Sequence, residues 1–215
     1  MYKTVIFDLD GTLLDTLDDL TSAVNAGLSA YGFARRKKEE VLSFIGNGIA
    51  KLMERAANFQ GDAKALLTAF KAYYAVHCAD QTKPYDGIIP LLKQLKEQGV
   101  KIGVLSNKAD FAVKQLIYGY FGDIFDDVQG EDEEHGVYRK PNPSALLSMM
   151  ERLNAVPSQT VYVGDSDVDI QTAKNAGVNC ISVSWGFKKK EFLKEQGASV
   201  IVDSVEELLE TLTRK

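Results

Sequence analysis

The chain has few cysteines, few histidines and no long apolar run. Its 215 residues include two cysteines and two histidines, without the spacing of a disulfide framework or a zinc site. No stretch of about 18 apolar residues occurs, which excludes a transmembrane helix. The net charge of −5 argues against a general nucleic-acid binder, and the first residues are typical of a strand rather than a signal peptide. We therefore expect a cytoplasmic protein without a membrane or nucleic-acid partner.

The pattern of apolar residues predicts two kinds of structure in one chain. An apolar content of 45% is typical of a globular protein with a sizeable core. From residue 83 onward, short apolar runs alternate with helical patterns, which predicts βαβ units and a parallel sheet. Residues 17–77 contain no convincing strand. We expect a core of residues 1–16 and 81–215, with residues 17–80 forming a helical bundle over the carboxyl edge of the sheet. The alternative is one layer of helices covering a sheet face.

Turn signals at glycine and proline set the expected element boundaries. After the first strand, further strands are expected at 101–105, 124–128, 160–163, 179–183 and 199–202. Helices are expected at 17–31, 37–44, 49–58, 62–76, 84–98, 109–120, 143–153, 166–176 and 205–212.

Two aspartates follow the first apolar strand, which includes Val5, Ile6 and Phe7. Side chains at positions i and i+2 of a strand share a face, so Asp8 and Asp10 can converge where the strand ends. Two carboxylates that close cannot both be ionised in a dry site without a compensating cation. This pattern predicts either a site for a hard metal ion or an acid/base pair.

Other polar clusters follow later strands of the predicted sheet. Ser106, Asn107 and Lys108 end one strand, and Lys140 opens a helix shortly afterwards. The segment 164–169, which contains three aspartates, ends another strand. Because the carboxyl ends of parallel strands lie at one edge, we expect these groups to share a crevice with the first two aspartates. Trp185 follows a further strand end, where its ring either lines the crevice or packs beneath the last loops.

This inventory suits phosphoryl transfer assisted by Mg²⁺. The ion prefers hard oxygen ligands, which Asp8, the backbone carbonyl of Asp10 and Asp165 could supply. A carboxylate beside Mg²⁺ and a lysine can attack phosphorus and form an aspartyl-phosphate. Ser106 can donate to phosphoryl oxygens, Lys140 can neutralise charge, and Asp10 can move the proton.

At these residues the chain resembles the haloacid dehalogenase superfamily, and within it the phosphoglycolate phosphatases. The resemblance is carried, in order along the chain, by D-L-D-G-T from Asp8, L-S-N-K around Ser106, K-P-N-P from Lys140 and G-D-S-x-x-D around Asp165. It implies an α/β, Rossmann-like fold of three layers, with a parallel sheet in the strand order 5-4-1-2-3. It also implies a helical cap inserted after the first motif.

The resemblance also implies a role for each motif residue. Asp8 would be the nucleophile, Asp10 the acid and base, and Lys140 the charge anchor. Asp165 would ligate Mg²⁺, and Asp169 would support the metal site or Lys140. Further expected roles are phosphate binding by Leu9, Asp10, Ser106, Asn107 and Lys140, metal binding by Asp8, Asp10 and Asp165, and support of the metal by Thr12.

The segment 45–56 resembles the cap of phosphoglycolate phosphatases. Gly48 would belong to a turn facing the active site. Lys51 and Arg55 lie four residues apart and share a helix face. That face is expected to bind the carboxylate of a small substrate, and the alternative is an ordinary solvated basic face.

By the family pattern, Asp10 favours a phosphatase or a phosphomutase. The leading expectation is a Mg²⁺-dependent phosphatase acting on a small phosphorylated metabolite, with 2-phosphoglycolate as the best candidate. A sugar phosphomutase like β-phosphoglucomutase and an inorganic pyrophosphatase are the alternatives. A phospho-receiver switch is disfavoured, because a receiver carries its aspartate on a middle strand and lacks an inserted helical cap. The oligomeric state is expected to be a monomer or a weak homodimer.

Overall fold

The computed structural model describes residues 1–46 and 48–214 and divides into two compact units. The sheet unit consists of Met1–Leu14 and Pro84–Lys215, and the helical unit of Asp15–Lys83. The sequence placed these boundaries after residues 16 and 80. That the helical unit acts as a cap stays a prediction.

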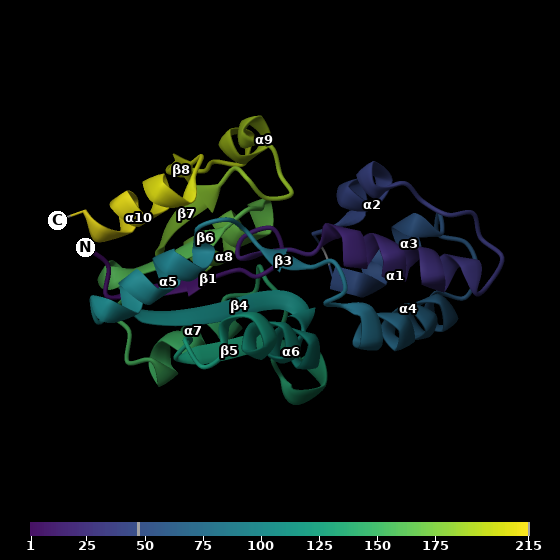
Figure 1. Cartoon of the computed structure of the whole chain (residues 1–215), viewed down its shortest axis with the longest axis horizontal. Helices are drawn as coiled ribbons and strands as arrows, with labels where there is room; N and C mark the ends of the chain where they lie inside the picture. Colours follow the sequence, from purple (N-terminus) through teal and green to yellow (C-terminus); the bar gives the residue numbers. More distant parts are fainter. Residues whose placement is uncertain (47, 215) are drawn as a thin grey trace. The chain divides into compact units, whose positions relative to one another are not determined.

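The sheet unit is built on six parallel strands in the order β5-β4-β1-β6-β7-β8 (Figure 1). The central strand β1 pairs with β4 on one side and with β6 on the other. Numbered along the chain, the first five strands have the order 5-4-1-2-3, which confirms the predicted Rossmann-like fold. The strands are β1 (Thr4–Phe7), β4 (Lys101–Ala109), β5 (Asp127–Glu131), β6 (Thr160–Gly164), β7 (Asn179–Val183) and β8 (Ile201–Val202).

Helices flank this sheet and bury both of its faces (Figure 1). Ile6 and Tyr162 are fully buried in a cluster with residues of α7 and α8. Val5 and Phe7 alternate with Ile6 along β1 and are also fully buried, so they fill the opposite face. The helices of this unit are α5 (Ile88–Glu97), α6 (Asp110–Phe121), α7 (Ser144–Arg152), α8 (Asp167–Ala176), α9 (Lys190–Glu195) and α10 (Val205–Thr213), with short 3₁₀ turns at Glu133–His135 and Pro157–Gln159.

The carboxyl ends of β1, β4 and β6 meet at one edge of the sheet. Phe7, the last residue of β1, lies in register with Val104 of β4 and Val163 of β6. The next residues along these strands therefore converge. Beyond Leu105 the pairing of β4 with β5 shifts register before it resumes at Ala109. A bulge of this kind bends a strand and re-aims its side chains.

The structure differs from the expected elements at several places. The strand expected at 124–128 lies at β5 (Asp127–Glu131), and Asp126, just before it, accepts a hydrogen bond from the backbone N–H of Ile102. The strand expected at 101–105 continues to Ala109. Helix α9 was not predicted. The short strands β2 (Leu14–Asp15) and β3 (Lys83–Pro84), which also were not predicted, form a two-stranded sheet.

Among its described residues, the helical unit contains four helices, as the sequence predicts. Its first and fourth helices approach closely at Gly27, where an added methyl group would lie 2.9 Å from Cε of Met53 and 3.2 Å from the carbonyl oxygen of Leu66. Asp62 caps the fourth helix by accepting from the N–H of Lys64 at 2.9 Å. The helices are α1 (Leu17–Ser29), α2 (Lys38–Phe44), α3 (Gly48–Ala56) and α4 (Ala63–His77).

The turn that the sequence predicts at 46–48 includes Asn47, which lies outside the described residues. Within 1–46 and 48–214, no helix combines the length and the apolar character needed to cross a membrane.

Candidate active site

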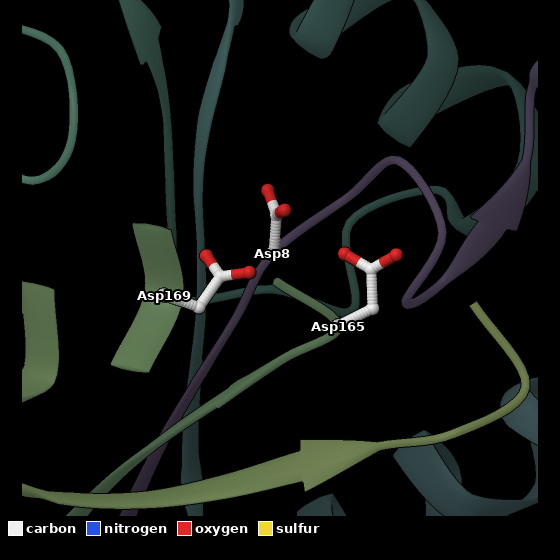
Figure 2. A group of neighbouring side chains, drawn as sticks. All are labelled: Asp8, Asp165 and Asp169. Atoms are coloured by element: carbon white, nitrogen blue, oxygen red, sulfur yellow. The ribbon is translucent and has the colours of Figure 1, made fainter. Parts of the chain in front are cut away.

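Three buried aspartates from distant parts of the sequence gather at the carboxyl edge of the sheet (Figure 2). Asp8 follows β1, Asp165 follows β6, and Asp169 lies in the first turn of α8. Each offers one carboxylate oxygen, and these three oxygens all lie within 4.8 Å of one another. The parallel sheet therefore brings the first and the last of the predicted motifs together at one edge.

Lys140 neutralises part of this negative charge. Its Nζ lies 2.9 Å from Oδ1 of Asp8 and 2.7 Å from Oδ1 of Asp169, and the lysine side chain is 3% exposed. Nζ also donates to the hydroxyl of Tyr162 at 3.0 Å, and that hydroxyl donates to the carbonyl of Leu105 at 2.7 Å. The ammonium of Lys140 is thus held between the carboxylates of Asp8 and Asp169 and the hydroxyl of Tyr162.

Asn107 holds the backbone of Lys140, a contact that the sequence did not indicate. Its Nδ2 donates to the carbonyl of Lys140 at 3.0 Å, and its Oδ1 accepts from the N–H of Lys140 at 2.7 Å. The side-chain amide of Asn107 therefore bonds both the backbone N–H and the backbone carbonyl of Lys140. Direct binding of phosphate by Asn107 stays a prediction.

Asp169 is positioned by the start of its own helix. Its Oδ2 accepts from the N–H of Ser166 at 3.1 Å and from the hydroxyl of the same serine at 2.6 Å. With Oδ1 bound to Lys140, hydrogen bonds engage both of its oxygens. The arrangement places Asp169 beside the lysine, and its expected role in supporting Lys140 or the metal site stays a prediction.

Burial and neighbouring charges perturb the ionisation of Asp8, Asp165 and Lys140. Burial raises the pKa of Asp8 to about 7, although Lys140 opposes the rise. Burial, followed by the charges of Asp169 and Asp8, also raises the pKa of Asp165 well above its usual range. Burial alone would lower the pKa of Lys140, but Asp169 and Asp8 raise it well above the usual lysine value. The site therefore holds more negative charge than its lysine can balance.

The donor set fits a divalent cation. Three carboxylates face one ammonium, so full ionisation leaves an excess of two negative charges. Oδ1 of Asp8 is buried and, despite the nearby ammonium, has no hydrogen bond of good geometry among the described residues. Oδ2 of Asp165 accepts from the N–H of Phe187 at 2.5 Å, which orients that carboxylate. Because both oxygens of Asp169 already accept hydrogen bonds, Asp8 and Asp165 are the better placed ligands for an ion such as Mg²⁺.

Asp10 lies beside the cluster with a cation of its own. Its Oδ1 lies 2.7 Å from Nζ of Lys108, whose side chain is 4% exposed. Ser106, at the bulge of β4, is 3% exposed and accepts from the N–H of Lys108 at 3.3 Å. The sequence named Lys108 within a motif but gave it no role, because only the folded chain brings it to Asp10.

The loop after Asp8 is folded on its own backbone. The carbonyl of Leu9 accepts from the N–H groups of Leu13 and Leu14, each at 3.0 Å. Thr12 is fully buried, and its Oγ1 has no hydrogen-bond partner among the described residues. The roles expected for Leu9 in binding phosphate and for Thr12 in supporting the metal stay predictions.

The three residues expected to bind substrate from the cap all lie in α3. Gly48 begins that helix. Lys51 lies 2.7 Å from Glu54, one turn along the helix, and both are exposed or half-buried. Arg55 donates from Nη1 to the carbonyl of Phe44 at 2.8 Å, which ties α3 to the end of α2. Binding of substrate by Gly48, Lys51 and Arg55 stays a prediction.

The segment from Trp185 to Phe187 packs against Asp165 and against the loop that follows Asp8. The indole N–H of Trp185 donates to the carbonyl of Thr12 at 3.2 Å. Between them, a methyl group on Gly186 would lie 2.3 Å from the carbonyl oxygen of Gly11 and 2.4 Å from Cβ of Asp165. Only glycine fits here, so this segment sets the position of both the Asp8 loop and Asp165.

We expect Gly186→Ala to weaken the binding of Mg²⁺ about 10- to 100-fold, as loss of support around a metal ligand does in other proteins. The added methyl group forces Asp165 or the loop at Gly11 to move. Calorimetric titration with Mg²⁺ measures the effect. Gly119→Ala is the matched control, because Gly119 lies in α6 with nothing near its added methyl group. Equal affinity for Mg²⁺ in both variants would contradict this account of the segment.

Comparison with known proteins places this α/β fold, with its cluster of buried carboxylates, in a family of hydrolases. A model of the haloacid dehalogenase-like hydrolases matches residues 5–183. The chain belongs to this family, which confirms the resemblance inferred from its motifs.

Individual relatives cover nearly all of the chain. Phosphoglycolate phosphatase 1 of Pseudomonas aeruginosa is 34% identical over 96% of this chain and 78% of its own length. Pyrophosphatase PpaX of Bacillus mycoides is 31% identical over 99% of this chain and 97% of its own. Among solved structures, a candidate phosphoglycolate phosphatase from Lactobacillus delbrueckii subsp. bulgaricus is 37% identical, with a TM-score of 0.94 over 100% of this chain and 99% of that one.

Proposed function

We propose that this protein is a Mg²⁺-dependent phosphatase that hydrolyses a small phosphate monoester through an aspartyl-phosphate on Asp8. The observation that carries the proposal is the position of Asp8. It is a buried carboxylate held 2.9 Å from Lys140, within a cluster that also contains Asp165. Membership of the hydrolase family and relatives named as phosphatases support the same reaction.

In the first step, an oxygen of Asp8 attacks phosphorus, and the bond between phosphorus and the leaving oxygen breaks. Asp10 gives its proton to that oxygen, so that the product leaves as an alcohol. Lys140 stabilises the negative charge that Asp8 and the phosphoryl oxygens share. The hydroxyl of Ser106 is expected to donate to one of those oxygens.

In the second step, water attacks the phosphorus of the aspartyl-phosphate. Asp10, now a carboxylate, takes the proton of this water, and the bond between phosphorus and Asp8 breaks. Inorganic phosphate and a free Asp8 carboxylate result, with Asp10 protonated again. Atoms and charges balance over the cycle, and the only co-reactant is water.

Asp8 and Asp165, with the backbone carbonyl of Asp10, are the residues proposed to hold Mg²⁺. When bound, the ion would balance the excess negative charge and polarise the phosphoryl group. The remaining carboxylate, Asp169, would keep Lys140 in place from the other side.

The substrate we propose is 2-phosphoglycolate, the substrate named for relatives in Pseudomonas. Inorganic pyrophosphate is the second candidate, because PpaX of Bacillus mycoides matches nearly the full length of this chain. Phosphate release with Mg²⁺ should be measured across 2-phosphoglycolate, pyrophosphate, sugar phosphates and nucleotides. The proposal expects the highest kcat/KM for one of the first two. Absence of release from every phosphate compound, or full activity after removal of divalent metal, would overturn it.

We expect the affinity for Mg²⁺ to rise with pH at least up to about pH 7. Burial raises the pKa of Asp8 to about 7 in the metal-free protein, so below that pH a proton occupies a metal ligand. Burial also raises the pKa of Asp165, the second carboxylate ligand. Binding must then release protons, and the dissociation constant should fall at least about tenfold for each pH unit between about 5 and 7. Calorimetry at several pH values, in buffers of different ionisation enthalpy, measures both the affinity and the protons released. If the affinity did not depend on pH, Asp8 could not be a metal ligand whose pKa burial raises to about 7.

A further inference from the structure

Lys108 is a buried charged residue that the proposed reaction does not use. It lies at the bulge of β4, where pairing with β5 shifts register between Leu105 and Ala109. Its side chain is 4% exposed, and its Nζ lies 2.7 Å from Oδ1 of Asp10. Burying an ammonium costs several kcal/mol unless an anion compensates. The pair at Asp10 provides that anion, at the edge of the site.

The backbone around Lys108 is held firmly. Oδ1 of Asp110 accepts from the N–H of Gly130 at 3.0 Å and from Nε2 of Gln129 at 3.2 Å, which fastens the bulge to β5. An added methyl group on Gly130 would lie 2.4 Å from Cα of Asp110, so the two segments are in close contact. The backbone that carries Lys108 is therefore preorganised, and preorganisation lowers the ordering cost of binding an anion.

The two lysines contact different aspartates of the proposed reaction. Lys140 contacts Asp8, the proposed nucleophile. Lys108 contacts Asp10, which must reach the leaving oxygen to protonate it. The ammonium of Lys108 is therefore one side chain removed from the leaving oxygen when Asp10 is in place. The part of the substrate nearest to that ammonium would be the leaving fragment and not the transferred phosphoryl group.

We propose that Lys108 recognises a second anionic group on the leaving fragment of the substrate. Without substrate, the carboxylate of Asp10, whose side chain is 18% exposed, balances the charge of this ammonium. With substrate bound, the anionic group of the substrate balances it instead, and Asp10, still in contact with Lys108, carries the proton that it gives to the leaving oxygen. This inference rests on the proposed function and narrows its substrates to one class. They are phosphate esters or anhydrides whose leaving fragment carries a negative charge a few bonds from the leaving oxygen. Both candidate substrates named above have this form.

The test compares two substrates of similar size, of which one carries this charge and the other does not. In 2-hydroxyethyl phosphate a neutral hydroxymethyl group replaces the carboxylate of 2-phosphoglycolate. We expect Lys108→Met to reduce the preference for 2-phosphoglycolate, taken as the ratio of the two kcat/KM values, about 10- to 100-fold. The matched control is Lys114→Met, which removes a lysine 2.6 Å from Asp110 at the surface of the neighbouring helix and should keep the wild-type ratio.

An equal loss of kcat/KM on both substrates would overturn the inference, because a lysine that only positions Asp10 would slow both alike. If Lys108→Met does not fold, as judged by circular dichroism, Lys108→Gln applies the same test with a neutral side chain that can still donate to Asp10. Failure of the proposed function has a different signature. In that case the wild-type protein hydrolyses neither substrate with Mg²⁺, whereas here it hydrolyses both and only the ratio is in question.

Discussion

Asp8→Asn should lower kcat for phosphate release at least about 10⁴-fold, because a neutral amide cannot replace the attacking carboxylate. The side chain keeps its size, and its oxygen can still face Lys140, which lies 2.9 Å from Oδ1 of Asp8. The loss should therefore be chemical rather than structural. Steady-state phosphate release with saturating Mg²⁺ and 2-phosphoglycolate measures it, and circular dichroism checks that the variant is folded.

The same substitution should stabilise the metal-free protein at neutral pH. Burial raises the pKa of Asp8 from 3.8 to about 7, so ionising it in the folded state is unfavourable. Its protonation stabilises the fold below its unfolded pKa, and this contribution is lost as pH rises from about 4 to about 7. We expect Asp8→Asn to raise the free energy of unfolding at pH about 8 by about 1–3 kcal/mol in a chelator.

Saturating Mg²⁺ should reverse this order, because binding to the folded wild-type protein stabilises it and the variant has lost a ligand. Urea unfolding with and without Mg²⁺ measures both effects. Retained phosphatase activity in Asp8→Asn would exclude the proposed nucleophile. If Asp8→Asn were less stable than the wild type in the chelator, ionisation of buried Asp8 could not be unfavourable in the folded protein.

Lys140→Met should destabilise the fold and abolish phosphate release. Lys140 is the cation shared by Asp8 and Asp169, and Asp169 is fully buried. Removing one partner from a buried ion pair typically costs about 3–5 kcal/mol, because the remaining charge is uncompensated. Urea unfolding at pH about 8 in a chelator measures this loss.

The loss should shrink as pH falls from about 8 to about 5. Lys140 lowers the pKa of Asp8, so without the lysine that pKa rises further. The folded variant then binds protons that the unfolded chain has released, which stabilises it at low pH and not at high pH. Lys96→Met is the control, since it removes a partly exposed lysine 2.6 Å from Asp126 and should cost at most about 1 kcal/mol. Similar losses in both variants would contradict the central position of Lys140.

Much of the sheet could be predicted because buried parallel strands leave a strong signal. β1, β6 and β7 are rich in β-branched and other apolar residues, and each lies within a residue of its expected place. β5 was displaced because it is an edge strand of mixed and mostly polar residues, so the nearby apolar run at 124–125 gave a misleading boundary. α9 was missed because it is short, rich in charge and buries one residue, Leu193.

The site divides in a similar way. Asp8, Lys140, Asp165 and Asp169 could be grouped because Asp8 and Asp165 directly follow strand ends, Lys140 and Asp169 lie in segments that follow strands, and a parallel sheet brings such segments to one edge. The contacts that orient them depend on side-chain geometry that no spacing encodes. Examples are the pairing of Asn107 with the backbone of Lys140 and the hydrogen bond from Phe187 to Asp165.

The most direct test of the account is to trap the phosphorylated enzyme. Protein mixed with Mg²⁺ and 2-phosphoglycolate, or with pyrophosphate, should be quenched in acid within milliseconds, digested and analysed by mass spectrometry. The account predicts one phosphoryl group on the peptide that contains Asp8, absent from Asp8→Asn and lost on treatment with hydroxylamine, as an acyl phosphate requires. Turnover of either substrate with no phosphoryl group on Asp8, or with the group on another residue, would contradict it.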